Sequence, residues 1–333
     1  MAPLLEVREL RTHFVLPGGV LRAVDGVDLT VSAGQTLGIV GESGSGKTVL
    51  ARSLLRLIPE PPGMRAGGAV LFRGMDLQRL SERALRKIRG AEIGMVFQDP
   101  MTSLNPVLTI GQQIAEVLEV HLALGRVARR KRTLDLLERV GIPAGHQRVH
   151  DYPHQLSGGM RQRVTIAMAL ACQPKLLIAD EPTTALDVTI QMQILQLLKS
   201  YQRDTGMAMI YVSHDLGAVA SVADTVSVMY AGRIVETLPA ARLFAGARMP
   251  YTEALLRARP DPDARPHTRL AALEGQPPSP LDKAPGCPFA PRCAYADPRC
   301  RQWAPPLLAE RDHSVACWKP LAVHAPARKE SWA

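Results

Sequence analysis

A glycine-rich stretch near the N-terminus has the residue types and spacing that hold nucleotide phosphates. Residues 41–48 read Gly-Glu-Ser-Gly-Ser-Gly-Lys-Thr, which fits the pattern G-x-x-x-x-G-K-[ST]. Glycines let the backbone wrap closely around an anion, so that successive N–H groups point at it. Lys47 would reach the β- and γ-phosphates, and the Thr48 hydroxyl would hold Mg²⁺. The remaining residues predicted to line this cradle are Gly41, Ser43, Gly44, Ser45 and Gly46.

Two acidic residues follow a second pattern that is typical of a buried strand. The predicted strand over residues 175–179, whose last four residues are apolar, leads directly into Asp180 and Glu181. A carboxylate at the carboxyl end of a buried strand can lie beside Mg²⁺, which is the role expected for Asp180. Glu181 could then polarise the attacking water as a general base. Acids at a strand end are common, so this pattern gains its weight from the glycine-rich loop.

The segment over residues 156–162, Leu-Ser-Gly-Gly-Met-Arg-Gln, is the most specific short motif of the chain. Ser157 is placed to cap a new helix, and the two glycines after it expose N–H groups to a negative ligand. This segment resembles the signature of the ATP-binding-cassette (ABC) family, which reads Leu-Ser-Gly-Gly-x-x-Gln. The resemblance covers about residues 4–240 and implies an ATPase that uses ATP and Mg²⁺.

Further residues match the family's motifs in the expected order. Gln98 matches the Q-loop, a catalytic element that touches Mg²⁺, and residues 185–187 resemble the D-loop. His214 ends another apolar strand and matches the switch histidine near the γ-phosphate. Phe14 is the residue expected to stack on adenine, with His13 as its rival, because this segment lacks the family's usual Tyr.

The resemblance also implies partners. In this family the signature of one subunit completes the site of another, so Ser157 and Gly159 are expected to serve ATP in trans. We expect a dimer, with a paralogous ATPase subunit favoured over a second copy of the chain. The transported molecule would cross through two separate membrane permease subunits, supplied by a periplasmic or extracellular substrate-binding protein. The chain would then lie peripherally at the cytoplasmic face of the membrane.

Three segments are similar to the ATPase subunits of bacterial dipeptide and oligopeptide importers. They are residues 98–106, residues 152–156, and residues 249–256, where Met249 stands in place of the His of the branch's His-Pro-Tyr-Thr motif. Peptides are the expected cargo, and glutathione and nickel complexes remain alternatives. A cassette ATPase of DNA repair or translation is a further alternative, although such proteins usually carry two cassettes or a long coiled-coil insertion. We expect no nucleic-acid partner.

Four cysteines lie close together in the C-terminal part. Cys287, Cys293, Cys300 and Cys317 are spaced among prolines and arginines, whereas Cys172 lies apart. Four thiolates suit either tetrahedral zinc or a [4Fe–4S] cluster, and the absence of C-x2-C pairs weakens the zinc interpretation. His313 could also replace one thiol in a zinc site, and reduced thiols without a metal remain possible. The segment resembles the extension of dipeptide-importer ATPases, where such a quartet holds [4Fe–4S].

These residues require an α/β scaffold. Residues 36–40 and 175–179 read as buried strands, and residues 48–58 predict a helix that Pro59 ends. Asp187 can cap a helix whose Ile190, Ile194 and Leu197 face the core. We therefore expect a P-loop (RecA-like) nucleotide-binding domain over residues 1–245 with a helical subdomain at about residues 100–158. A smaller extension over residues 246–333 carries 15 of the 27 prolines.

Composition agrees with a globular protein of this kind. The 333 residues are 46% hydrophobic and 21% charged, which excludes a disordered chain. The longest apolar run, residues 164–172, is far shorter than the ~20 residues of a membrane span. The net charge of +9 is spread along the chain, and the one basic cluster, residues 126–132, is predicted to be a solvated helix face.

Overall fold

The computed structural model describes residues 2–184, 186–258, 273–279, 281 and 285–322. The chain forms two compact units. Unit 1 comprises Met1–Glu6, Thr30–Thr36 and Val70–Ser213, and unit 2 comprises Val7–Leu29, Leu37–Ala69 and His214–Ala333. Among the described residues, none of the helices is both long and apolar enough to cross a membrane.

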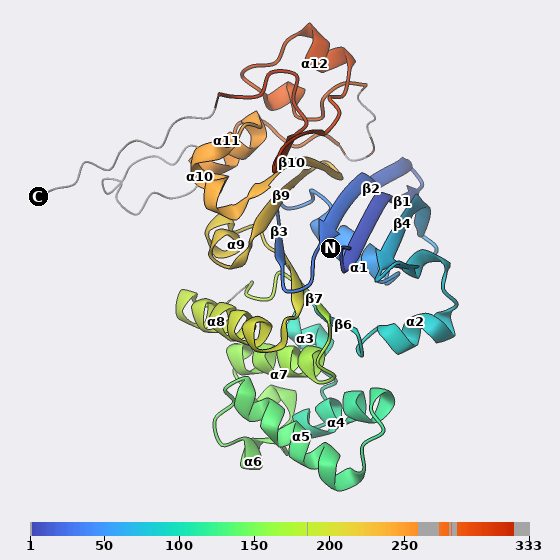
Figure 1. Ribbon diagram of the computed structural model, residues 1–333, viewed down its shortest axis with the longest axis vertical. Coiled ribbons are helices and arrows are strands. Elements are labelled where there is room, and N and C mark those ends of the chain that lie inside the picture. The colour runs from blue at the N-terminus through green and yellow to red at the C-terminus, as the bar shows by residue number, and fades with distance from the viewer. Residues whose placement is uncertain (1, 185, 259–272, 280, 282–284, 323–333) are drawn as a thin grey trace, which may run out of the picture. The chain divides into compact units, whose positions relative to one another are not determined.

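Unit 1 is a parallel sheet with helices that cover it and extend beyond it (Figure 1). Its elements, in chain order, are β5 (Met75–Asp76), α2 (Glu82–Ile88), β6 (Ile93–Val96), α3 (Pro100–Ser103), α4 (Ile110–His121), α5 (Arg126–Arg139), α6 (Gly145–Arg148), α7 (Gly158–Leu170), β7 (Leu176–Asp180), α8 (Val188–Thr205) and β8 (Ala208–Val212).

Strands β6, β7 and β8 of unit 1 are parallel neighbours. Leu176 pairs with Ile93 on one side and with Ala208 on the other. Every residue of β7 and β8 is buried, as expected for a parallel sheet covered on both faces. Gly94 lets α7 approach β6 closely, because a Cβ there would lie 2.4 Å from the Ala169 carbonyl oxygen. Asp180 is the last residue of β7 and therefore lies at the carboxyl edge of the sheet.

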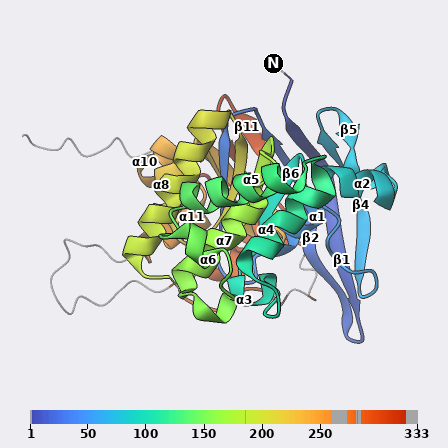
Figure 2. The same ribbon diagram turned by 90° about the horizontal axis from the view of Figure 1, so that it is seen from below.

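Residues 97–157, all of which are described, contain helices and no strand. Figures 1 and 2 show α4, α5, α6 and α7 grouped together. Thr109 and Gln112 form a capping box at the start of α4, and Arg129 of α5 pairs with Glu119 of α4 at 2.7 Å. The basic cluster lies on α5, where Arg126, Arg130 and Lys131 are exposed, so the predicted solvated face is confirmed.

Unit 2 contains five strands of a mixed sheet and most of the C-terminal part. Its elements are β3 (Thr36–Val40), α1 (Lys47–Leu54), α9 (Leu216–Val222), β9 (Thr225–Tyr230), β10 (Arg233–Pro239), α10 (Leu243–Gly246), α11 (Pro250–Arg257), α12 (Pro298–Gln302), β11 (Leu308–Glu310) and β12 (His313–Val315). Three further strands, β1 (Leu5–Leu16), β2 (Gly19–Val31) and β4 (Gly63–Phe72), lie mainly in this unit and form a sheet in the order β2-β1-β4.

The strands of the mixed sheet in unit 2 follow the order β11-β12-β10-β9-β3. β3 runs parallel to β9, while β9, β10 and β12 are antiparallel neighbours. Residues 313–315 therefore belong to the same sheet as the strand that precedes the phosphate-loop sequence. Glu236 of β10 pairs with Val315 of β12, which joins the extension to this sheet by backbone hydrogen bonding.

The helix after the glycine-rich loop is shorter than predicted. It ends at Leu54, whereas the sequence pattern extends to Ile58. Leu50 and Leu54 are fully buried as expected, but Arg56 takes a left-handed conformation with φ of 54°. That conformation cannot continue an α-helix, so the chain turns before the next apolar position.

Candidate functional site

The glycine-rich loop of unit 2 connects β3 to α1 and is held by its own lysine. Lys47 Nζ donates hydrogen bonds to the carbonyl oxygens of Gly41 and Glu42, at 2.8 and 2.9 Å. The Ser45 N–H donates to the same Glu42 oxygen at 3.1 Å. Ser43 and Gly44 are exposed, Ser45 is buried and Thr48 is half-buried. The tip of the loop is thus accessible, while its two ends are fixed.

Glycine is required at both ends of this loop. A Cβ at Gly41 would lie 2.2 Å from the Met229 carbonyl oxygen, and one at Gly46 would lie 2.1 Å from the Ala23 carbonyl oxygen. Both residues also have a positive φ, 155° and 106°. Gly46 is the N-cap of α1 and brings no side chain to its first turn. The N–H groups of that turn are therefore suited to bind an anion.

The predicted carboxylates of unit 1 are buried, and one of them lies in a local network. Asp180 is fully buried and Glu181 is 8% exposed. Glu181 Oε2 accepts hydrogen bonds from Gln98 Nε2 at 3.1 Å and from Thr184 Oγ1 at 2.9 Å. Its N–H donates to the Val212 carbonyl oxygen at 2.9 Å. The structure therefore brings together two of the three predicted catalytic residues, Gln98 and Glu181.

Glu181 also has a strained backbone. Its φ is 48°, in the left-handed region that side chains other than glycine rarely adopt. Such a conformation costs on the order of 1–3 kcal/mol and concentrates at functional sites. Its hydrogen bonds fix the carboxylate at the end of β7.

The signature segment starts helix α7 of unit 1. Ser157 is the N-cap and its side chain accepts a hydrogen bond from the Met160 N–H at 3.3 Å, as predicted. Ser157 and Gly158 are exposed. A Cβ on Gly159 would lie 3.0 Å from Ile190 Cγ2, so this position has little space for a side chain. The start of α7 thus offers exposed N–H groups to an external ligand.

The remaining predicted residues are placed as follows. His214 is exposed and follows β8, and Ala185 of the D-loop lies outside the described residues. Phe14 is half-buried on β1, whereas His13 is buried and its Nε2 lies 3.6 Å from Asp25 Oδ1. Burial lowers the pKa of His13 even though Asp25 acts against that shift. Phe14 has the more accessible ring, and its contact with adenine stays a prediction.

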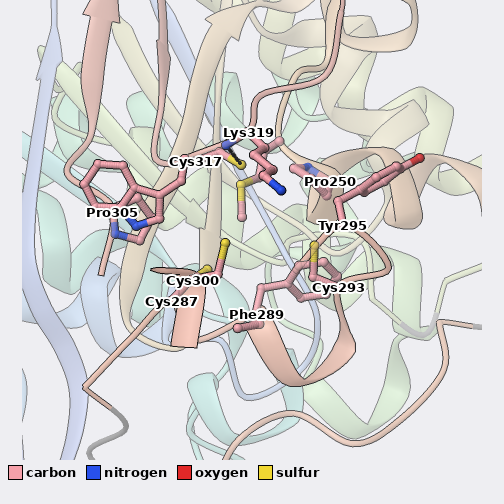
Figure 3. Close-up of a pocket in the computed structure, with 12 residues that line it drawn as sticks. Pro250, Cys287, Phe289, Cys293, Tyr295, Cys300, Pro305, Cys317 and Lys319 are labelled. Carbon is pink, nitrogen blue, oxygen red and sulfur yellow. Dashed lines mark hydrogen bonds between the residues drawn. The ribbon is translucent and has the colours of Figure 1, made fainter. Parts of the chain in front are cut away.

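The four C-terminal cysteines line one cavity (Figure 3). Cys287, Cys293, Cys300 and Cys317 share it with Phe289 and Tyr295 among others, and the described residues that line it include no carboxylate or histidine. Burial raises the pKa of Cys287 and Cys293, and it raises the pKa of Cys317 to about 11. The Lys319 N–H donates to the Cys317 sulfur at 3.3 Å. Donors to sulfur stabilise a thiolate, the form that binds metals.

This cavity is not a closed single-ion site. Among the described residues, no group of three or more His, Cys, Asp or Glu side chains is arranged to hold a metal ion. His313 does not line the cavity, and its Nε2 lies 2.8 Å from Glu236 Oε1 instead. The structure therefore speaks against the Cys₃His alternative. The donor chemistry suits a soft metal centre, and the thiols converge without surrounding one ion.

Two contacts on the glycine-rich loop were not predicted. Tyr251 of α11 accepts the Glu42 N–H at 2.9 Å, and the Arg292 guanidinium forms a forked ion pair with the Glu42 carboxylate. The motif around Tyr251 was recognised as a family resemblance only. Nothing in the local sequence connects Arg292 to a residue 250 positions earlier.

The chain is similar to known families and proteins over nearly its whole length. Residues 24–184 match the family described as ABC transporter, and residues 235–300 match the oligopeptide/dipeptide transporter C-terminal region. The oligopeptide transport ATP-binding protein OppD of Bacillus subtilis (strain 168) is 49% identical, over 98% of this chain and 94% of its own. The dipeptide transport ATP-binding protein DppD of Escherichia coli (strain K12) is 52% identical, over 96% and 97%.

A solved structure shares the fold. The dimeric post-hydrolysis structure of the ATP-binding cassette MJ0796, bound to ADP and Pi, superimposes with a TM-score of 0.65 at 28% identity. It covers 71% of this chain and 98% of the other.

Proposed function

The chain belongs to the ATP-binding subunits of ABC transporters, of the oligopeptide and dipeptide type, and we propose that its ATPase activity drives the import of peptides. The scaffold is the P-loop ABC ATPase fold. The observation that supports the proposal most is the buried Glu181, hydrogen-bonded to Gln98 in a chain whose relatives are peptide transport ATP-binding proteins over nearly their full length. The predicted division into residues 1–245 and an extension remains part of this proposal, with residues 100–158 as the helical subdomain.

The residues of the site have distinct roles toward ATP. The loop from Gly41 to Thr48 binds the phosphates through backbone N–H groups and the Lys47 ammonium. Mg²⁺ would supply charge neutralisation at the β- and γ-phosphates, with Thr48, Gln98 and Asp180 to hold it. Phe14 stacks on the adenine.

Hydrolysis requires a base for the attacking water. Glu181 accepts a proton from that water as its oxygen bonds to the γ-phosphorus, and ADP leaves with the electron pair of the broken P–O bond. Gln98 keeps the Glu181 carboxylate in position through the 3.1 Å hydrogen bond. His214 acts on the γ-phosphate.

The function needs other subunits. Ser157 and Gly159 contact ATP held by a partner ATPase subunit, which we propose is a paralogue. Two permease subunits form the path for the cargo, and a substrate-binding protein delivers it. The chain works peripherally at the cytoplasmic face of the membrane, through contacts with those permeases. Dipeptides or oligopeptides are the proposed cargo, with glutathione and nickel complexes as alternatives.

A transport assay tests this proposal. The full complex, reconstituted in vesicles, should take up a labelled dipeptide only with ATP, and Lys47→Ala should abolish uptake because the phosphate cradle loses its charge. Glu92→Gln is the matched control, since Glu92 forms an exposed ion pair with Arg73 in unit 1. Uptake that persists in Lys47→Ala would refute the proposed site. Binding of the purified chain to nucleic acid, with no permease partner, would favour the repair or translation alternative.

The four-cysteine cavity is proposed to hold a [4Fe–4S] cluster. In a tetrahedral zinc site with Zn–S bonds of about 2.3 Å, the sulfur atoms must lie about 3.8 Å apart. A cubane cluster places each thiolate on its own iron, so its ligands lie farther apart around a larger centre. The proposal is supported by the lining of the cavity, whose four thiols are the number and type of ligand that such a cluster takes.

Metal analysis of anaerobically purified protein tests the cluster. About four irons per chain and broad absorption near ~400 nm are expected for [4Fe–4S]. Cys293→Ser should lower the iron content, whereas Cys172→Ser, outside this cavity, should not. One zinc ion per chain in a colourless sample would refute the cluster and favour the zinc site. No metal under anaerobic conditions would mean that the cysteines are ordinary reduced thiols.

A further inference from the structure

Glu42, the second residue of the glycine-rich loop, has all of its polar groups held from within unit 2. Its N–H donates to Tyr251 Oη at 2.9 Å, and its carbonyl oxygen accepts hydrogen bonds from Lys47 Nζ and the Ser45 N–H. Its carboxylate accepts two hydrogen bonds from Arg292, at 2.7 and 3.0 Å. Two of these contacts, those from Tyr251 and Arg292, come from the C-terminal extension. The extension therefore contacts the phosphate-binding loop directly.

The Arg292 guanidinium has an acceptor for each of its five N–H donors. Besides the two carboxylate bonds, Nε donates to the Glu274 carbonyl oxygen at 3.0 Å. Nη1 donates to Tyr230 Oη and Nη2 to the Leu273 carbonyl oxygen, both at 3.4 Å. The side chain is only 3% exposed. Because every N–H donor of the Arg292 guanidinium has an acceptor, the guanidinium is held in one orientation. It therefore also fixes the orientation of the Glu42 carboxylate that it binds.

Three aromatic rings pack together beside this ion pair, and two of their hydroxyls contact it, Tyr230 at Arg292 and Tyr251 at the Glu42 N–H. Tyr230, Tyr251 and Phe289 are all buried, with ring centroids between 4.4 and 5.5 Å apart. Tyr230 comes from β9, Tyr251 from α11, and Phe289 from the segment between Cys287 and Cys293. The Arg292 side chain is 3% exposed and the Glu42 side chain 25% exposed, so the electrostatic interaction of this partly buried pair is screened less than that of an exposed pair. This location distinguishes it from the exposed ion pairs of the same unit.

The charge of Glu42 makes the pair relevant to nucleotide binding. A carboxylate in a loop that receives a polyphosphate would repel it, and the loop pattern G-x-x-x-x-G-K-[ST] does not require an acid at this position. Arg292 cancels that charge and ties the loop to the extension. It lies directly before Cys293, so that a displacement of the cysteine segment would move a side chain that contacts the loop directly.

We infer that Arg292 is a positioning residue for the phosphate-binding loop, and that the C-terminal extension sets the affinity for ATP through its ion pair with Glu42. This inference rests on the proposed role of residues 41–48 as the ATP cradle. It assigns to the extension a regulatory contact with the nucleotide site that acts within one chain.

A double-mutant cycle tests the inference. The full-length chain is titrated with a fluorescent ATP analogue and Mg²⁺, as wild type, Arg292→Gln, Glu42→Gln and the double variant. Arg292→Gln should raise Kd by about tenfold, because an uncompensated negative charge is then left in the loop proposed to bind the phosphates. The double variant should bind the analogue more tightly than Arg292→Gln, because no charge is then left to cancel, and Glu42→Gln completes the cycle. In the assembled transporter, Arg292→Gln should raise KM for ATP and leave kcat unchanged.

Arg242→Gln is the matched control. Arg242 pairs with Asp312 at 3.1 Å in the same unit, but both side chains are about half exposed, and this pair does not contact the loop. Its Kd should equal the wild-type value. A Kd within twofold of wild type for Arg292→Gln, or a double variant as weak as Arg292→Gln, overturns the inference.

Hydrogen exchange of the wild-type chain provides a test that does not depend on any variant folding. Because coupling is reciprocal, a saturating ATP analogue should slow exchange in residues 287–293. Unchanged exchange there, with the analogue bound, overturns the inference. Lys47→Ala distinguishes a failure of the proposed ATP cradle from a failure of the inference about Arg292. If this variant binds the analogue like wild type, the proposed cradle itself is wrong. If it loses binding while Arg292→Gln does not, only the contact from the extension is refuted.

Discussion

Replacing Glu181 by Gln isolates the proton-accepting role of this residue. The wild-type Oε2 accepts hydrogen bonds from Gln98 and Thr184, and the amide oxygen of a glutamine can accept both. The new side chain has the same length, and the Glu181 N–H bond to Val212 involves only the backbone. The variant should therefore keep the local structure, including the left-handed backbone, and lose only the carboxylate's basicity.

The size of the effect follows from that loss. General-base catalysis contributes about 10²- to 10⁴-fold, so we expect kcat to fall by about 10³, or about 4 kcal/mol of transition-state stabilisation. ATP binding should change by less than about threefold, because the phosphate contacts are made by the Gly41–Thr48 loop. ATP that binds without being hydrolysed should accumulate in a closed dimer. Thr184→Val, which removes one hydrogen bond to the base, should lower kcat by only about tenfold.

Phosphate release from the reconstituted transporter measures kcat, and titration with the fluorescent analogue measures binding. Glu92→Gln makes the same chemical change at an exposed ion pair of unit 1 and should match wild type in both. A Glu181→Gln variant that retains more than a tenth of the wild-type kcat would refute the role of Glu181 as the base. A Kd that rises in proportion to the loss of kcat would also contradict this role, because that would indicate a role in binding.

Three further predictions concern the dimer, acid stability and the buried part of the extension. In a mixed dimer, Gly159→Asp in this chain should abolish hydrolysis of the ATP bound by the partner and spare hydrolysis of the ATP bound by this chain. The two sites are distinguished by replacing the catalytic glutamate of one subunit at a time and measuring the remaining ATP hydrolysis. Since burial lowers the pKa of His13 below its unfolded value of 6.5 despite Asp25, stability should be constant above that pH and decline below it, as thermal unfolding at pH 7.5 and 5.5 would measure. His13→Gln should flatten that decline. Glu236→Ala should cost about 3 kcal/mol of unfolding free energy in denaturant titrations, because it leaves the buried His313 and two N–H groups without their acceptor.

Local patterns were sufficient to predict the strands and caps near the site. The strand over residues 36–40 has the predicted bounds, and β7 begins and ends one residue later than expected. Ser157 and Asp187 both cap helices as predicted, because an N-cap depends only on residues within one turn. Motif, cap and strand pattern all act over a few residues, which is why they could be read from the sequence.

Features that depend on packing were predicted less well. The core side of α8 is formed by Ile194, Leu195 and Leu198, so that Leu197 is only half-buried and the predicted face is rotated by one residue. The early end of α1 follows from the left-handed Arg56, which the apolar spacing does not reveal. The local sequence pattern allows more than one core face for α8 and more than one end for α1. In both cases packing against neighbouring elements decides between them.

The ion pair between Glu42 and Arg292 shows most clearly that contacts between distant residues cannot be predicted from local sequence patterns. Each residue taken alone looks like an ordinary surface charge, and 250 positions separate them. The two residues meet in the folded unit 2, where β12, which follows the cysteine segment in the chain, pairs with β10 of the sheet that also contains β3. Only the folded sheet shows that the acid at position 42 has a buried cation as its partner.

A second route connects the extension to the same loop residue. His313 of β12 contacts Glu236 Oε1, and this oxygen also accepts the N–H groups of Arg248 and Met249 just before α11. Helix α11 then carries Tyr251, whose hydroxyl accepts the Glu42 N–H. Arg292 fixes the carboxylate of Glu42, while this route fixes its backbone. Since the two routes share no side chain before Glu42, removal of Arg292 alone leaves the backbone of the loop supported. Its loss should therefore weaken ATP binding without unfolding the site.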